Sequence, residues 1–311
     1  MRTPLPAFVL SLAVAGLTPT PTAWAQTPKP KPKPAPALRV PDSVVFESGL
    51  VYTSPGGREL KLDLARPKSG GGPFPAVVCI HGGGFRAGNR ESYDNLIVRL
   101  AERGYVAATV SYRLAPEFPF PAAVHDVKAA VRWMKANAGK YHVDPERVGV
   151  TGGSAGGHLA QFLGVTADEP RFEGDGGHPG ESSRVACVVN VYGPSDLTRS
   201  YGKSVDAAEV LPLFLGGNLD TARQKHVVAS PLTWASKGDA PTLIIHGTDD
   251  KYVAHEQAVW MLDALQAHGV DAELLTLPGA GHGFKGDDAK KADDALFAFF
   301  DARLKPAPKA K

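Results

Sequence analysis

Residues 147–160 read RVGVTGGSAGGHLA and hold one serine among glycines, between a β-branched run and a helix-like run. The run before the serine is typical of a buried strand, and the run after it favours a helix. A strand that turns directly into a helix forces the turn residue toward a positive φ, which is costly for a residue with a Cβ. The pattern G-x-S-x-G thus predicts a strained turn that exposes the Ser154 hydroxyl. A Gly-rich linking turn is the alternative interpretation of the same letters.

Short apolar runs recur on both sides of this stretch, and amphipathic segments separate them. The predicted strands are 44–53, 60–66, 76–81, 106–113, 147–152, 185–193, 241–247 and 272–279. The predicted helices outside the serine turn are 95–104, 122–140, 256–269 and 293–305. The first two strands indicate an antiparallel entry, and the later runs are typical of parallel strands buried on both faces. The alternation predicts an α/β fold with a doubly wound, mostly parallel eight-stranded sheet, helices on both faces and a small helical insertion at 194–236.

The N-terminal region has the order of a secretory signal peptide. Arg2 precedes an apolar stretch at 8–17, and a polar region ends in Ala23-Trp24-Ala25. We therefore expect cleavage after Ala25 and a secreted or periplasmic protein. The apolar stretch is far shorter than the ~20 residues of a membrane span, so we expect no span in the mature chain.

The remaining boundaries follow from composition. Alternating Pro and Lys predict an extended linker, and the segment after the last helix repeats this composition. The predicted organisation is a signal peptide at 1–25, a linker at 26–41, one catalytic α/β domain at 42–305 and a flexible tail at 306–311.

Composition excludes several classes of function. The formal net charge is +2 and the basic residues are scattered, which argues against a nucleic-acid partner. The sequence contains neither a metal-ligand spacing of Cys and His nor a phosphate-binding loop with its lysine, so we expect no metal and no cofactor. The acidic loop with Glu173, Asp175 and His178 is better explained as solvated than as a cation site. Cys79 and Cys187 lie in separate strand-like runs and should be free thiols.

A serine hydroxyl needs a base and an orienting carboxylate to act as a nucleophile. His282 is the candidate base, because it follows the last predicted strand in a glycine-rich loop. The carboxylate should come from Asp249 or Asp250, which follow the preceding strand, and their spacing does not choose between them. The glycines of HGGGF at 81–85 follow another strand, so their N–H groups and that of Ala155 are candidates to stabilise an oxyanion.

Five motifs carry a resemblance to known enzymes. They are HGGGF (81–85), SYRLAPE (111–117), GGSAGG (152–157), HGTDD (246–250) and GAGHGF (279–284). In this order they resemble the α/β-hydrolase esterases of the hormone-sensitive-lipase-like group and, more closely, the bacterial acetyl-xylan and feruloyl esterase (BD-FAE-like) group. The resemblance covers roughly residues 42–303. It implies Asp250 as the acidic residue, and Gly83, Gly84 and Ala155 as the oxyanion-hole donors.

These observations predict a serine carboxylic ester hydrolase (EC 3.1.1) that forms an acyl-enzyme on Ser154 and acts on short-chain or carbohydrate-linked esters. An apolar patch suggests Phe85, Leu213 and Phe214 as substrate-binding residues. The alternatives are hydrolysis of another acyl bond, as in an arylformamidase or a prolyl-oligopeptidase-like peptidase, and a non-catalytic binding protein with the same fold. The sequence leaves the acyl and alcohol groups of the substrate and the oligomeric state open.

Overall fold

Eight strands form one sheet in the order β1-β2-β4-β3-β5-β6-β7-β8. The computed structural model describes residues 38–167, 169–205 and 207–305. The strands are β1 (Val44–Thr53), β2 (Leu60–Pro67), β3 (Phe74–Ile80), β4 (Val106–Val110), β5 (Val143–Gly153), β6 (Cys187–Val191), β7 (Thr242–Gly247) and β8 (Ala272–Leu277). The pairs β1·β2 and β2·β4 are antiparallel, and the other five pairs are parallel. The predicted mostly parallel sheet with an antiparallel entry is confirmed.

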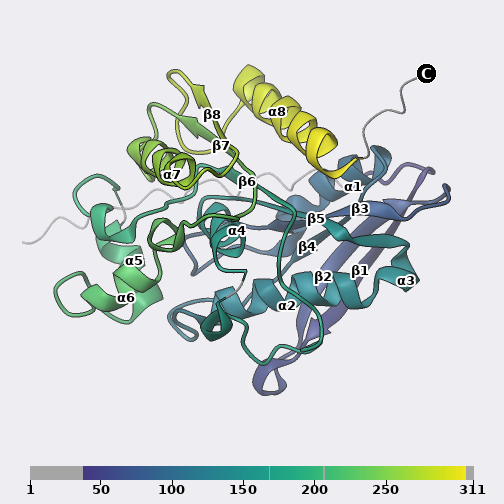
Figure 1. The fold of residues 1–311 in the computed structure, drawn as a ribbon, viewed down its shortest axis with the longest axis horizontal. Coiled ribbons are helices and arrows are strands. Elements are labelled where there is room, and N and C mark those ends of the chain that lie inside the picture. Colours follow the sequence, from purple (N-terminus) through teal and green to yellow (C-terminus); the bar gives the residue numbers. More distant parts are fainter. Residues whose placement is uncertain (1–37, 168, 206, 306–311) are drawn as a thin grey trace, which may run out of the picture. The chain divides into compact units, whose positions relative to one another are not determined.

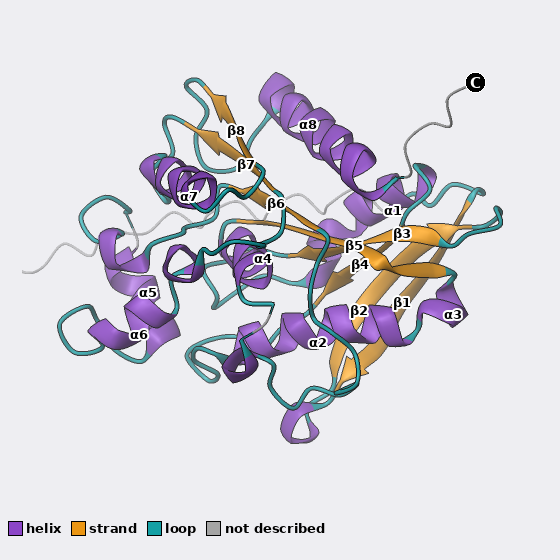
Figure 2. Cartoon of the chain, in the orientation of Figure 1, coloured by secondary structure: helices purple, strands orange, loops and turns teal. Residues whose placement is uncertain are grey.

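Helices cover both faces of the sheet (Figures 1 and 2). They are α1 (Asp94–Glu102), α2 (Ala122–Ala136), α3 (Ala138–Tyr141), α4 (Ala155–Val165), α5 (Ala207–Leu215), α6 (Arg223–Val228), α7 (Glu256–Ala267) and α8 (Gly286–Leu304). Strand residues alternate between two cores: Val78 and Ile80 pack with α2 and α4, whereas Val77 and Cys79 pack with α1 and α8. This alternation explains why the strands are continuous apolar runs.

Two helix boundaries differ from the prediction. The segment expected as one helix over 122–140 breaks at Asn137 into α2 and α3. Helix α8 begins at Gly286 rather than at residue 293, with Asp287 and Asp288 in its first turn. Carboxylates there interact favourably with the helix dipole, which a search for apolar periodicity does not detect.

The predicted free thiols are confirmed. Cys79 lies on β3 and Cys187 on β6, and β5 runs between these two strands. Both side chains are buried and neither forms a disulfide. Burial raises the pKa of both thiols, that of Cys187 to about 12, so they are poor nucleophiles.

The segment between β6 and β7 contains the predicted helical insertion. Its helices α5 and α6 lie next to each other at the left of Figure 1, in green. They lie on the same side of the molecule as α4 and α7. The predicted signal peptide, most of the linker and the tail lie outside the described residues. Within the described part of the chain, no helix combines the length and the apolar character that crossing a membrane requires.

Candidate active site

The serine turn has the strained geometry that the sequence predicts. Strand β5 ends at Gly153, α4 begins at Ala155, and Ser154 between them has φ 57° and ψ −123°. A Cβ on Gly156 would lie 2.0 Å from the carbonyl oxygen of Ile80, so only glycine allows the helix to start this close to β3. The Ser154 amide donates to the carbonyl of Val191 at 2.9 Å, which ties the turn to the end of β6.

His282 and Asp250 are brought together from two neighbouring loops. Asp250 follows β7 and His282 follows β8, and the Nδ1 atom of His282 lies 2.7 Å from Oδ2 of Asp250. The other carboxylate oxygen, Oδ1, accepts the backbone amides of Tyr252 and Val253, both at 2.9 Å. Asp249 is exposed instead, and its amide donates to the carbonyl of Ala280. Of the two aspartates between which spacing did not choose, Asp250 is the one in contact with His282.

These contacts keep the Asp250 carboxylate charged. Burial raises its pKa, but hydrogen bonds from His246, from His282 and from the Val253 amide outweigh that effect. The net result is a pKa well below the ordinary value of an aspartate. A charged carboxylate accepts the Nδ1 proton of His282, which leaves Nε2 of that ring as the proton acceptor.

The glycine loop after β3 reaches the same place. Gly83 and Gly84 have φ values of 116° and 60°, and a Cβ on Gly83 would lie 2.2 Å from the carbonyl oxygen of Ala87. His81 braces this loop, because its Nδ1 atom lies 2.8 Å from the Gly82 carbonyl oxygen and its ring stacks on Tyr112. Gly82, Gly83 and Gly84 therefore present backbone without side chains to the pocket.

One pocket of about 510 Å³ joins all of these elements. It is lined by Gly82, Gly83, Gly84, Phe85, Arg86, Ala87, Tyr93, Gly153, Ser154, Ala155, Tyr192, Val210, Tyr252, Val253 and His282. The predicted base and all predicted oxyanion donors therefore share one cavity with Ser154, and the carboxylate of Asp250 lies directly behind His282. In the described residues, no group of three or more His, Cys, Asp or Glu side chains could hold a metal ion.

Two tyrosines missed by the sequence analysis flank the imidazole of His282. The ring of Tyr192 lies 4.6 Å from that of His282, and the ring of Tyr252 lies 5.3 Å from it. Burial raises the pKa of Tyr192, so its hydroxyl remains a hydrogen-bond donor. Tyr192 follows β6 and Tyr252 follows β7. Both positions could have been found by asking which residues come just after the carboxyl ends of parallel strands.

The predicted substrate-binding residues need a correction. Phe85 lines the pocket, but Leu213 and Phe214 do not. Phe214 is buried behind Phe85, with stacked rings 3.8 Å apart, and Leu213 packs against the edge of the core. Val210 is the residue of α5 that reaches the pocket.

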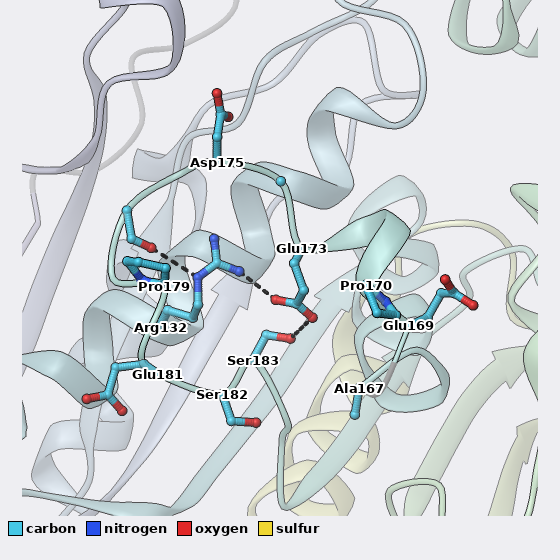
Figure 3. Close-up of a pocket in the computed structure, with 12 residues that line it drawn as sticks. Arg132, Ala167, Glu169, Pro170, Glu173, Asp175, Pro179, Glu181, Ser182 and Ser183 are labelled. Atoms are coloured by element: carbon cyan, nitrogen blue, oxygen red, sulfur yellow. Dashed lines mark hydrogen bonds and ion pairs between the residues drawn. The ribbon is translucent and has the colours of Figure 1, made fainter.

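A second cavity, of about 560 Å³, lies in the polar loop after α4 (Figure 3). Its buried Arg132 pairs with Glu173 at 2.6 Å, and Glu173 also accepts from Ser183 and from the fully buried Lys128. Asp175 is exposed and points away from these groups. Glu173 thus pairs with two buried cationic side chains of the protein, whereas the sequence analysis expected a solvated loop.

The family model described as BD-FAE matches residues 62–265. The chain belongs to the BD-FAE family. Among solved structures, this BD-FAE member resembles a truncated carbohydrate esterase from gut microbiota, with a TM-score of 0.75 and 27% identity, covering 84% of this chain and 97% of the other. It also resembles the propionate-bound esterase Est2 of Thermogutta terrifontis, with a TM-score of 0.72 and 28% identity over 86% of this chain and 97% of that one.

One of the curated relatives is named an esterase as well. The BD-FAE member is 33% identical to esterase LipC of Mycobacterium tuberculosis, and the match covers 68% of this chain. This chain spans only about half of the length of that relative, 53% of it. The sheet and its esterase neighbours show that the chain has the α/β-hydrolase fold.

Proposed function

We propose that this BD-FAE member is a serine carboxylic ester hydrolase. The observation that carries the proposal is the 2.7 Å contact between Asp250 and His282 in a site where Ser154 is held at a positive φ. A nucleophile, a base and a carboxylate that orients the base are the minimum set for acyl transfer through serine. The named esterases among its relatives support the same activity.

The first step is acylation of Ser154. Its Oγ attacks the ester carbonyl carbon as Nε2 of His282 takes the hydroxyl proton. The carbonyl oxygen becomes an oxyanion that the N–H groups of Gly83, Gly84 and Ala155 stabilise. The carbonyl re-forms, the bond to the alcohol oxygen breaks, and the imidazolium of His282 returns the proton to that oxygen.

The second step is hydrolysis of the acyl-enzyme. Water attacks the acyl carbonyl, His282 takes its proton, and the same N–H groups stabilise the second oxyanion. Collapse of this intermediate releases the carboxylic acid and regenerates the Ser154 hydroxyl. Asp250 stays ionised throughout and stabilises the imidazolium in both steps.

The proposed substrates are short-chain and carbohydrate-linked esters, including those of acetyl-xylan and feruloyl type. Phe85 and Val210 give the glycine-loop side of the pocket a small apolar wall, which suits a short acyl group. Two structural neighbours, one a carbohydrate esterase and one an esterase with bound propionate, support these two features separately. We also propose that the protein is exported, on the signal-peptide pattern that ends at Ala25.

The test is covalent labelling followed by a substrate panel. A fluorophosphonate probe should label Ser154, and Ser154→Ala should abolish the labelling; an unlabelled wild type would favour a non-catalytic binding protein. The panel should contain acetylated xylan, methyl ferulate, p-nitrophenyl esters of short and long acids, N-formylkynurenine and aminoacyl anilides. Hydrolysis confined to formamides or anilides would replace the ester assignment by an arylformamidase or a peptidase.

A further inference from the structure

Tyr192 follows the end of β6 in an unusual backbone conformation. Its φ is 44°, in the left-handed region that a residue with a Cβ adopts only at a cost in free energy. Its amide donates to the carbonyl of Ile245 at 2.8 Å, which ties this conformation to the neighbouring strand β7. Strained residues are concentrated at functional sites, which makes the Tyr192 side chain a candidate for a role in the reaction.

The side chain of Tyr192 extends from the catalytic base to the serine turn. Its ring centre lies 4.6 Å from that of His282. Its hydroxyl oxygen lies 3.2 Å from the point where a Cβ of Gly153 would be, and Gly153 directly precedes Ser154. All four residues line the same pocket. The Tyr192 hydroxyl is therefore next to the serine turn and on the His282 side of the pocket.

The hydroxyl of Tyr192 can bind a small molecule in this pocket. Burial raises the pKa of Tyr192, and the negative charge of Asp250 adds to that effect, so the phenol is neutral. A neutral phenol has one O–H group to donate and oxygen lone pairs that accept. Among the residues that the structure describes, none forms a hydrogen bond with this hydroxyl.

The two steps of the proposed reaction place different groups beside His282. In acylation, Nε2 of His282 gives a proton to the alcohol oxygen, whose other substituent is a carbon atom. In deacylation, Nε2 takes a proton from water, whose oxygen carries a second hydrogen instead. An acceptor for that second hydrogen orients a lone pair of the water toward the acyl carbon. Water can therefore use a hydrogen-bond acceptor at this place, whereas the alcohol cannot.

We propose that the Tyr192 hydroxyl holds the water that hydrolyses the acyl-enzyme. The inference rests on the proposed esterase function and adds a catalytic residue to its second step. The water donates one hydrogen to Nε2 of His282 and the other to the phenol oxygen of Tyr192. As the water oxygen bonds to the acyl carbon, the first proton passes to Nε2. Collapse of the intermediate breaks the bond to Oγ of Ser154, which receives that proton, and the second hydrogen leaves on the carboxylic acid.

Methanol provides the test, because it competes with water for the acyl-enzyme and has a methyl group in place of the second hydrogen. With p-nitrophenyl acetate and a fixed methanol concentration, the ratio of methyl acetate to acetate measures how the acyl-enzyme divides between the two nucleophiles. Tyr192→Phe should raise this ratio about fivefold, the effect of losing one neutral hydrogen bond to water. The value of kcat/KM for p-nitrophenyl acetate should stay near that of the wild type, because it reports acylation.

Tyr201→Phe is the matched control and should change neither quantity, since the Tyr201 hydroxyl contacts His226 and Tyr201 does not line the pocket. A product ratio in Tyr192→Phe equal to that of the wild type would overturn the proposal. If kcat/KM fell at the same time, Tyr192 would act by holding His282 in place. A wild type that neither hydrolyses p-nitrophenyl acetate nor reacts with a fluorophosphonate would reject the esterase function and this role together.

Discussion

The Nε2 atom of His246 lies 2.9 Å from the carbonyl oxygen of Val253 and 3.4 Å from Oδ2 of Asp250. A carbonyl can only accept, so Nε2 carries a proton that points between the two oxygens. The side chain is fully buried, and its Nδ1 atom has no hydrogen-bond partner among the described residues. His246 is thus a second imidazole beside the Asp250 carboxylate, and it does not line the pocket of Ser154.

We expect His246→Leu to lower kcat about tenfold or more while KM stays near the wild-type value. Loss of the N–H group leaves the Val253 carbonyl unpaired and frees the Asp250 loop, and small displacements of a catalytic group are costly. Steady-state kinetics on p-nitrophenyl acetate measure this effect. His255→Leu is the control, because His255 binds Thr276 instead of Asp250, and an equal loss of kcat in that variant would contradict a specific role for His246.

Ser154→Ala should lower kcat on p-nitrophenyl acetate by about a millionfold, since a triad without its nucleophile retains only the contribution of binding and the oxyanion hole. The matched control is Ser182→Ala, a serine that lines the second cavity. Substantial turnover in Ser154→Ala, once contaminating esterases are excluded, would disprove the nucleophile.

Ser154→Gly should be more stable than Ser154→Ala by about 1 kcal/mol in free energy of unfolding. Both variants lack the hydroxyl, but alanine keeps a Cβ at φ 57° and ψ −123°, whereas glycine adopts this conformation without strain. Urea unfolding of the two inactive proteins measures the difference. Equal stabilities would show that the turn holds no strain in solution.

Acidification should destabilise the fold through His158. Burial lowers the pKa of this histidine to about 4, although a hydrogen bond to the Pro194 carbonyl opposes the shift, and its Nε2 atom is unpartnered next to the rings of Phe85 and Phe214. Because the folded state binds this proton less readily than the unfolded chain, the stabilisation is complete above about pH 6.5 and is lost as the pH falls toward 4. The free energy of unfolding should fall by about 3 kcal/mol as this histidine becomes protonated.

His158→Gln separates this effect from the other acidic groups of the protein. Glutamine can donate to the same carbonyl but does not titrate, so the variant should lose about 3 kcal/mol less stability between pH 7 and pH 4 than the wild type. Urea unfolding curves at several pH values give this difference. Parallel pH dependences for the two proteins would refute the assignment to His158.

Local sequence predicted the elements that depend on short-range physics. The strands, the strained serine turn and the position of His282 all follow from apolar runs, glycines and strand ends. Asp249 and Asp250 are adjacent residues in one loop, and only the folded position of His282 distinguishes them. The same limit explains the correction at α5: helical periodicity groups Val210 with Phe214, but it does not tell which of them faces the pocket.

The hydrogen bond from the Ser154 amide to Val191 joins two neighbouring strand ends, and Tyr192, the next residue, also has a positive φ, of 44°. The nucleophile is therefore braced before the chain enters the insertion that carries α5 and α6. That insertion touches the pocket through Val210, while the triad comes from other loops. We therefore expect that changes within this insertion would reshape one wall of the pocket without moving Ser154, Asp250 or His282.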